Sequence, residues 1–308
     1  MKIKALHIFV LLFSLSQSVS IQAGREDSVT MYKRRKIEAW TGLVGGTAAV
    51  HSSLYSSWYS EYSRSRFHWF NDNAEWKQMD KAGHAFSSYF VGVNAAALFR
   101  FSGYSQKRSA VYGAFIGILF QTPLEIMDGY STGWGASKGD LLSNSAGTLF
   151  AAFQNYKWGK PRIPIRITFH TSSFANQRPN LLGQTLPERL LKDYNGQTYW
   201  IDLNPHRLKL KWKKWPKWLG VNFGYGADGL LGGDDNIWTD ASGKINDRSD
   251  VQRYRQYYVG PSVSFGYLQK SKRPLLQVVG FVSERLRLPM PALEYNVKNG
   301  FQFHPLYW

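Results

Sequence analysis

The stretch Ile163–His170 reads IPIRITFH and divides the chain into two halves of different character. Apolar and other side chains alternate along it, which is the pattern of a half-buried β-strand. The residues before it are rich in Ala, Gly and Ser with apolar residues at helical spacing, whereas the residues after it are rich in Val, Tyr, Phe and Trp. We therefore expect an α+β protein, with an N-terminal helical bundle over residues 24–160 and an antiparallel β region over residues 161–308.

Four helical segments are expected in the first half, because apolar residues recur there every three or four positions. The uncharged runs in the second and third segments are shorter than the ~20 residues that a membrane span needs. A compact bundle, buried in protein or set partly into a bilayer surface, is therefore expected. Gly113 and Gly117 would let the third helix approach a neighbour closely. The four segments are Ile37–Tyr59, Asp80–Phe101, Arg108–Asp128 and Gly139–Tyr156.

The second half is expected to form further strands joined by turns and one long loop, Gly226–Asp250. Asn299-Gly300 is a hairpin-turn dipeptide. The C-terminal FQFHPLYW ends in an aromatic residue and resembles the C-terminal signal of outer-membrane β-barrels, although an ordinary edge strand interrupted by Pro305 fits as well. A small closed barrel and an open membrane-associated sheet therefore both remain possible. The further strands are Trp218–Gly226, Tyr254–Leu268, Leu275–Leu288 and Leu293–Phe303.

Residues 1–23 are expected to form a secretory signal peptide. Lys2 and Lys4 precede the apolar run Ala5–Leu15, and a Ser-rich stretch leads to a plausible cleavage point after Ala23. The alternative is an uncleaved anchor helix, which the shortness of the apolar run disfavours. We expect an exported protein in the periplasm or outer membrane of a Gram-negative bacterium.

The 308 residues include 38 Lys and Arg against 21 Asp and Glu, a formal net charge of +17, and no cysteine. The missing cysteine excludes a disulfide scaffold, a thiol nucleophile, Cys-ligated zinc, an iron–sulfur cluster and a lipid-anchored N-terminal Cys. An exported and strongly basic protein is expected at a membrane surface, near anionic lipid, lipopolysaccharide or a polyanionic glycan. A nucleic-acid partner is not expected, because the chain is exported and carries no nucleic-acid-binding motif.

The segment Lys209–Trp218 interleaves five lysines with three tryptophans, and we call it the Lys/Trp segment. Indole rings favour the headgroup layer of a membrane, and lysines favour anionic headgroups. The alternative is a solvated basic loop whose tryptophans pack inward. The residues expected to bind lipid are Lys211, Trp212, Lys213, Lys214, Trp215 and Trp218.

Three expected helices each carry a polar pair on one face, because residues three or four apart share a helix face. Burying a charge is costly unless it is paired or hydrogen-bonded. If these faces point inward, the pairs must meet one another or a ligand. The pairs are Asp80 with His84, Glu125 with Asp128, and Asp140 with Asn144.

These pairs lie in the pattern DKxxH, then ExxDG, then WGxSxGDxxxNxxG, between Met79 and Gly147. The pattern resembles a family of predicted periplasmic lipoproteins of unknown function, which is itself similar to VanZ-like membrane proteins. Residues 191–200 and 224–229 resemble the longer form of this family found in Bacteroidetes-type bacteria. The resemblance implies an N-terminal bundle, an envelope location and a polar site, but no established reaction. The chain departs from the family in one respect, because it contains no cysteine. The implied site residues are Asp80, Lys81, His84, Glu125, Asp128, Asp140 and Asn144.

Several functions fit such a site. A hydrolase or transferase acting on a lipid-linked or glycan substrate would use His84 as acid or base, oriented by Asp80 or Glu125, with Lys81 stabilising anionic charge. A metal-dependent version would use His84 and the carboxylates as ligands for magnesium, manganese, calcium or zinc, and the sequence does not choose among them. The alternatives are a buried network that locks the helices together and a binding module for an anionic headgroup.

Overall fold

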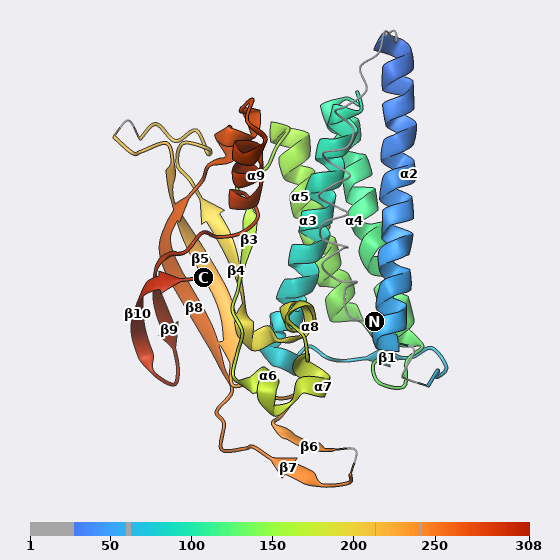
Figure 1. Cartoon of the computed structure of the whole chain (residues 1–308), viewed down its shortest axis with the longest axis vertical. Coiled ribbons are helices and arrows are strands. Elements are labelled where there is room, and N and C mark those ends of the chain that lie inside the picture. Colours follow the sequence, from blue (N-terminus) through green and yellow to red (C-terminus); the bar gives the residue numbers. More distant parts are fainter. Residues whose placement is uncertain (1–27, 60–62, 213, 241) are drawn as a thin grey trace. The chain divides into compact units, whose positions relative to one another are not determined.

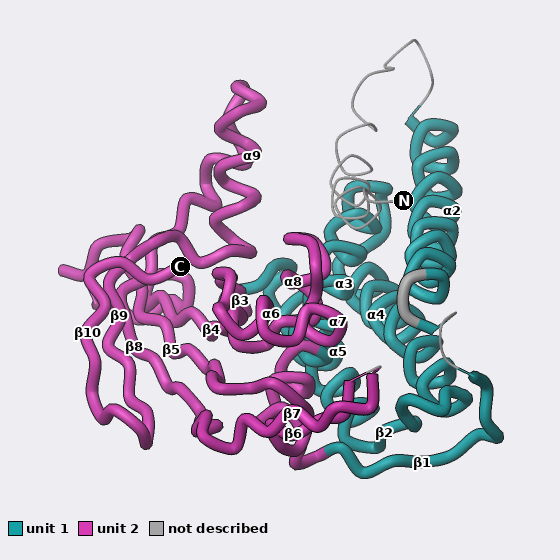
Figure 2. The backbone as a smooth tube through the Cα atoms, turned by 60° about the horizontal axis from the view of Figure 1, so that its bottom comes forward, with its two compact units in different colours: residues 1–72, 84–161 teal, residues 73–83, 162–308 magenta. Residues whose placement is uncertain are grey.

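A computed structural model of the chain describes residues 28–59, 63–212, 214–240 and 242–308. The expected signal peptide and Lys213 lie outside these residues. The chain forms two compact units (Figure 2): a helical unit up to Asp72 and over His84–Pro161, and a sheet unit over Asn73–Gly83 and Arg162–Trp308. Helices followed by an antiparallel sheet confirm the expected α+β class. The expectation of separate domains that meet near residue 160 stays a prediction.

The helical unit is built from four long helices that run alongside one another (Figure 1). Three of them lie close to the ranges expected from sequence, but the first begins nine residues earlier, because the charged stretch Lys33–Lys36 interrupts its apolar pattern. The helices are α2 (Ser28–Leu54, continued by a π-helical turn at Tyr55–Tyr59), α3 (Met79–Phe101), α4 (Gln106–Gly129) and α5 (Lys138–Trp158).

Small residues bring α3, α4 and α5 into close contact. A Cβ atom added to Gly113 would lie 2.6 Å from the carbonyl oxygen of Gly92, and one added to Gly147 would lie 2.0 Å from that of Ala85. Both distances are too short for a real side chain, so only glycine permits these approaches. The expected close approach of α4 through Gly113 is confirmed, and it brings backbone and polar side chains of three helices within bonding distance.

Side-chain caps fix the starts of two of these helices. The Ser105 hydroxyl accepts from the backbone N–H of Arg108 at the start of α4, and the Ser137 hydroxyl accepts from that of Asp140 at the start of α5. Ser137 also belongs to β2 (Ala136–Ser137), which pairs in parallel with β1 (Trp69–Phe70). This short pairing ties the start of α5 to the segment before α3.

Within the described part of the chain, α4 is the helix long and apolar enough to cross a membrane, judged by length and composition. One third (33%) of its most apolar window is buried in the protein. The core helix of a soluble protein has the same character, so this property decides nothing by itself.

The sheet unit contains a six-stranded antiparallel sheet in the order β10-β9-β8-β5-β4-β3. Residues 297–299 connect β9 to β10, and Gly300, paired with Asn296, has a φ of +69°, the left-handed conformation that follows a three-residue hairpin loop. The strands are β3 (Ile165–Phe169), β4 (Gln197–Leu203), β5 (Leu219–Asp228), β8 (Tyr254–Val263), β9 (Met290–Asn296) and β10 (Gly300–Tyr307).

The expected strand Leu275–Leu288 is wrong. Pro274–Ser283 forms the helix α9 instead, with Pro274 at its first position, where its missing N–H has no helical partner to lose. The β-branched and aromatic residues there suggested a strand, but packing overrides such weak local preferences. The expected loop Gly226–Asp250 contains a hairpin of β6 (Ile237–Thr239) and β7 (Ile245–Asp247), and β4 lies outside the strands expected from sequence.

Short helices and one segment from the first half complete the sheet unit. The helices are α6 (Phe174–Gln177), α7 (Pro179–Leu182) and α8 (Leu186–Lys192). Residues 73–83 bring Met79 into a buried cluster with Ala227 and Leu230. Just before α3, Trp76, Lys77 and Gln78 all have positive φ, between 50° and 68°. Such a run is strained, and the strand hydroxyl of Tyr225 holds it by donating to the carbonyl of Lys77.

Candidate functional site

The polar residues of α3, α4 and α5 converge around the imidazole of His84. Glu125 lies near the end of α4, while Asp140 and Asn144 share one face of the first turns of α5. His84 Nδ1 is 3.1 Å from Asn144 Oδ1 and 3.5 Å from Glu125 Oε1, and His84 Nε2 is 3.9 Å from Asp140 Oδ1. All three expected polar pairs therefore contribute at least one residue to one cluster.

The hydrogen-bond network fixes which nitrogen of His84 carries a proton. Asn144 Oδ1 accepts from Gln121 Nε2 at 3.0 Å, and its amide nitrogen donates to Glu125 Oε1 at 3.4 Å. The Asn144 oxygen can only accept, so His84 Nδ1 must donate to it. The other ring nitrogen, Nε2, lies on the side of Asp140.

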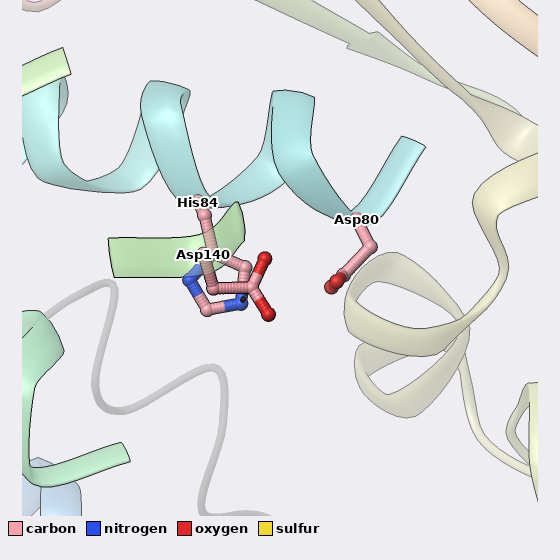
Figure 3. A group of neighbouring side chains, drawn as sticks. All are labelled: Asp80, His84 and Asp140. Carbon is pink, nitrogen blue, oxygen red and sulfur yellow. Dashed lines mark ion pairs between the residues drawn. The ribbon is translucent and has the colours of Figure 1, made fainter. Parts of the chain in front are cut away.

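Asp80, His84 and Asp140 each offer one ligand atom, and these atoms lie within 4.8 Å of one another. Asp80 stands one helical turn before His84, and Figure 3 shows both side chains on the same side of α3, with Asp140 beside the imidazole. The side chains of His84, Glu125 and Asp140 are 17%, 4% and 7% exposed. Electron-rich atoms thus gather where water screens them weakly.

Two expected site residues have other partners. Asp128 accepts a hydrogen bond from the hydroxyl of Tyr59 at 2.6 Å, which ties the end of α4 to the turn after α2. The Lys81 ammonium lies 3.1 Å from Asp80 Oδ2, and the other Asp80 oxygen accepts from the Tyr194 hydroxyl at 2.9 Å. Lys81 is therefore adjacent to the cluster through Asp80, whereas Asp128 is not part of the group that can hold a metal.

Three further residues support the cluster and were missed from sequence. Gln121 also donates to the backbone carbonyl of His84 at 3.2 Å, and its position one turn before Glu125 was the available signal. The Ser137 amide donates to Glu125 Oε2 at 3.3 Å, and the Ser137 hydroxyl donates to Asp72 at 2.5 Å. Ser137 and Asp72 were not among the site residues expected from sequence, and no local pattern marked Asp72.

A cavity of about 290 Å³ lies elsewhere in the helical unit. None of its lining residues belongs to the His84 cluster. Two of its lining residues bond Asp128: the Tyr59 hydroxyl donates to its carboxylate, and the Ser131 backbone N–H donates to its carbonyl. The residues lining it are Tyr55, Tyr59, Ser63, Arg64, Ile126, Met127, Tyr130 and Ser131.

The Lys/Trp segment connects β4 to β5 and is largely exposed. Trp212 and Trp218 are 58% and 52% exposed, and Lys211 and Lys214 are exposed as well. Trp215 is held more closely, because its indole N–H donates to the carbonyl of Leu219 at 2.6 Å. The inward packing considered for these tryptophans therefore fits Trp215, while Trp212 and Trp218 are available to a partner.

Comparison with known families adds one match, and it covers the cluster. Residues 68–156 match the model of a family described as predicted periplasmic lipoprotein (DUF2279). The matched region holds every residue of the His84 cluster and under a third of the 308 residues. No curated protein and no solved structure matches the chain. The match supports the resemblance to periplasmic proteins and, with it, export.

Proposed function

We propose that this chain is an exported cell-envelope protein, associated with the outer membrane, that holds a divalent cation between Asp80, His84 and Asp140. The periplasmic description of the matching family and the signal-like residues 1–23 support the location. The relation to VanZ-like proteins and the Bacteroidetes-type longer form belong to the same proposal. The spacing of DKxxH, ExxDG and the later DxxxN supports the VanZ relation, and residues 191–200 and 224–229 support the longer form.

The convergence of three electron-rich atoms carries the metal proposal. Asp80, His84 and Asp140 bring their ligand atoms within 4.8 Å of one another, and His84 Nε2 faces Asp140. Two carboxylates repel each other in a poorly solvated site, so a cation between them stabilises the arrangement. The Nδ1 side of His84 donates to Asn144, which is how metal-binding histidines are commonly oriented.

Hydrolysis or group transfer on a lipid-linked or glycan substrate is the activity that this site would serve. One histidine with two carboxylates suits magnesium, manganese, calcium or zinc. A bound cation would polarise a substrate oxygen and acidify a bound water. Glu125 would orient His84, and Lys81 would stabilise developing anionic charge.

Metal content of the purified chain tests this proposal. After dialysis against each cation, we expect elemental analysis to find about one bound ion per chain, lost in His84→Ala and Asp140→Asn. Asp128→Asn is the matched control, because Asp128 bonds Tyr59 and should leave the metal content unchanged. Equal metal content in all variants, or none in the original chain, would refute the metal site.

A purely structural network is the competing explanation for the same cluster. It predicts that His84→Ala lowers the melting temperature strongly, because Asn144 and Glu125 lose a buried partner. The proposed site instead predicts that added metal raises the melting temperature of the original chain and leaves that of His84→Ala unchanged.

Binding of anionic lipid or lipopolysaccharide without turnover is the second candidate function. The exposed side chains of Lys211, Trp212 and Trp218 favour it. Flotation with anionic vesicles should be salt-sensitive and weakened in Lys211→Ala/Lys214→Ala. Lys244→Ala, an exposed lysine in the β6–β7 hairpin, is the control. Binding that is unchanged in the double variant would exclude the Lys/Trp segment as the contact.

A further inference from the structure

The outward face of the six-stranded sheet carries an unbroken row of apolar side chains. Hydrogen-bonded partners place these residues in register from β3 to β10. Except at the β3 end, all of them are exposed to solvent, Phe303 by 66%. The row consists of Ile165, Ile201, Phe223, Val259, Leu293 and Phe303.

A second row lies two residues further along each strand and is mostly aromatic. Residues 73–83 cover part of it, because Tyr225 donates to the carbonyl of Lys77 and Gly83 lies against the Tyr199 hydroxyl. The part on β8, β9 and β10 remains exposed, with Phe301 at 73%. The row consists of Ile167, Tyr199, Tyr225, Tyr257, Tyr295 and Phe301.

The opposite face of the sheet is buried, and it combines the aromatic core cluster around Trp200 with many polar groups. Arg166 and Asp202, both fully buried, form an ion pair at 2.9 Å. Buried Glu294 pairs with His304 at 2.8 Å. The sheet also curls around this face, because Thr198 on β4 bonds Tyr307 on β10 at 2.8 Å, whereas a flat sheet would separate those strands by about 19 Å.

A water-soluble sheet turns a polar face to solvent, whereas the exposed face of this sheet is apolar and its charged side chains lie on the buried face. Sheets that face lipid show the reverse arrangement, with apolar side chains outward and polar side chains inside. A continuous exposed apolar surface of this kind marks a contact with a membrane or with another protein.

The two ends of the sheet differ in charge, one strongly basic and the other close to neutral. Residues 204–218, between β4 and β5, hold six Lys or Arg and no acidic residue, and residues 264–289, between β8 and β9, add five more basic residues against one Glu. Both connections leave the sheet at the same end. At the other end, the connections 170–196, 229–253 and 297–299 together hold seven basic and seven acidic residues, so their charges cancel. An anionic surface would therefore attract the first end in preference to the second.

We infer that the exposed face of β5, β8, β9 and β10 inserts into one leaflet of an anionic lipid bilayer, with the Lys/Trp segment among its headgroups. Lipid fits better than a second copy of the chain, because basic and tryptophan side chains border the apolar face at one end. The two rows lie about 7 Å apart along the strands, a depth that suits insertion into one leaflet. This inference deepens the proposed outer-membrane association and does not depend on the metal site.

A fluorescent label at a single cysteine tests the insertion directly, because the 308 residues contain no other cysteine. The label is placed on the full chain at Leu293→Cys in the first row or at Ile245→Cys in the β6–β7 hairpin, both exposed. With vesicles of phosphatidylcholine and phosphatidylglycerol, we expect the Leu293→Cys label to shift to the blue and to be quenched by acyl-chain spin labels. The Ile245→Cys label should show neither change.

Substitutions give an independent readout by vesicle flotation. Leu293→Ser/Phe303→Ser should weaken binding by about tenfold or more, since it removes two large apolar side chains from the contact. Ile245→Ser should change binding by less than about twofold. Both variants alter exposed side chains, so an unchanged melting temperature is expected and confirms that the fold persists.

Three results would overturn the inference: no binding to anionic vesicles, a Leu293→Cys label that stays in water on bound protein, or a blue shift without lipid that accompanies dimer formation. A blue shift that accompanies dimer formation would show that the apolar face binds a second copy of the chain. Binding that is equally tight without phosphatidylglycerol would overturn the role of the basic end. Metal content should be the same in the original chain and Leu293→Ser/Phe303→Ser, so failure here is distinguishable from failure of the metal proposal.

Discussion

At the scale of single residues, buried charges are concentrated inside the curled sheet and in the His84 cluster. Arg166 and Asp202 show how such charges are satisfied: the Arg166 guanidinium also donates to the carbonyl of Val263 at 3.1 Å, and the Ser262 hydroxyl donates to Asp202. A buried ion pair contributes little net stability compared with a well-packed apolar pair, but an orphaned member is costly.

Arg166→Met alone should therefore lower the free energy of unfolding by about 3–5 kcal/mol, because Asp202 stays buried without its partner. Urea denaturation measures this loss. Arg166→Met/Asp202→Leu should recover much of it. If the double variant is as unstable as the single one, the cost does not come from the unpaired charge.

Glu284 gives a pH-dependent contribution of predictable sign. Burial raises its pKa, but the charge and hydrogen bond of Arg207 and a hydrogen bond from Ser264 outweigh burial, so the net pKa lies below its ordinary value of 4.5. The contribution of Glu284 to stability should be complete above pH 4.5 and be lost as the pH falls through the lowered pKa.

Glu284→Gln should therefore destabilise the chain at neutral pH, and the difference from the original chain should shrink as the pH falls below about 4.5. Urea midpoints measured between neutral and acidic pH check this. A difference that stays constant with pH would show that Glu284 acts by packing alone.

At the scale of elements, local patterns predicted the long helices well and the β region less well. The starts of α3 and α5 agree to within one residue with the expected ones, because apolar spacing and helix-start residues are local signals. The segment of α9 was mistaken for a strand, because tertiary packing decides its conformation. The packing is close: a Cβ on Gly280 would lie 2.6 Å from the Gln269 backbone nitrogen. No local pattern encodes that contact.

Gly113→Ala should destabilise the helical unit by about 1–3 kcal/mol, because the new methyl group would overlap the Gly92 carbonyl oxygen. Gly45→Ala on α2 is the matched control, since nothing lies within 4 Å of the added carbon. That change should stabilise the helix by up to about 1 kcal/mol. Thermal unfolding followed by circular dichroism would reveal opposite shifts, and shifts of the same sign would contradict the packing argument.

At the scale of the whole molecule, sequence motifs predicted the site residues, but only the structure shows which of them lie together. Sequence spacing placed Asp80 with His84 and Asp140 with Asn144 on shared helix faces, and both pairs join the cluster. Spacing also placed Asp128 with Glu125, yet Asp128 bonds Tyr59 instead. A helical period fixes which residues share a face but not how far along a helix the neighbouring helix makes contact.

The association of residues 73–83 with the sheet unit also lay beyond prediction, because Met79 meets residues about 150 positions later in the sequence. Met79→Ala should cost about 2–5 kcal/mol, since this fully buried side chain packs against Ala227 and Leu230. Urea unfolding measures the loss. Met290→Ala, a partly exposed methionine of β9, should cost less, and an equal cost would argue against the buried position of Met79.

Because residues 73–83 pack in the sheet unit, the order in which the chain is exported determines when they can be buried. A chain that crosses a membrane from its amino terminus delivers Trp76 and Met79 long before Ala227 and Leu230 arrive to cover them. The helix α3, which begins in this segment, and the later helices α4 and α5 can form early, since their contacts are near in sequence. The left-handed turn at residues 76–78 must wait for Tyr225. Newly exported chains should therefore pass through a stage in which this turn is exposed, and a periplasmic chaperone would have its main opportunity to bind there.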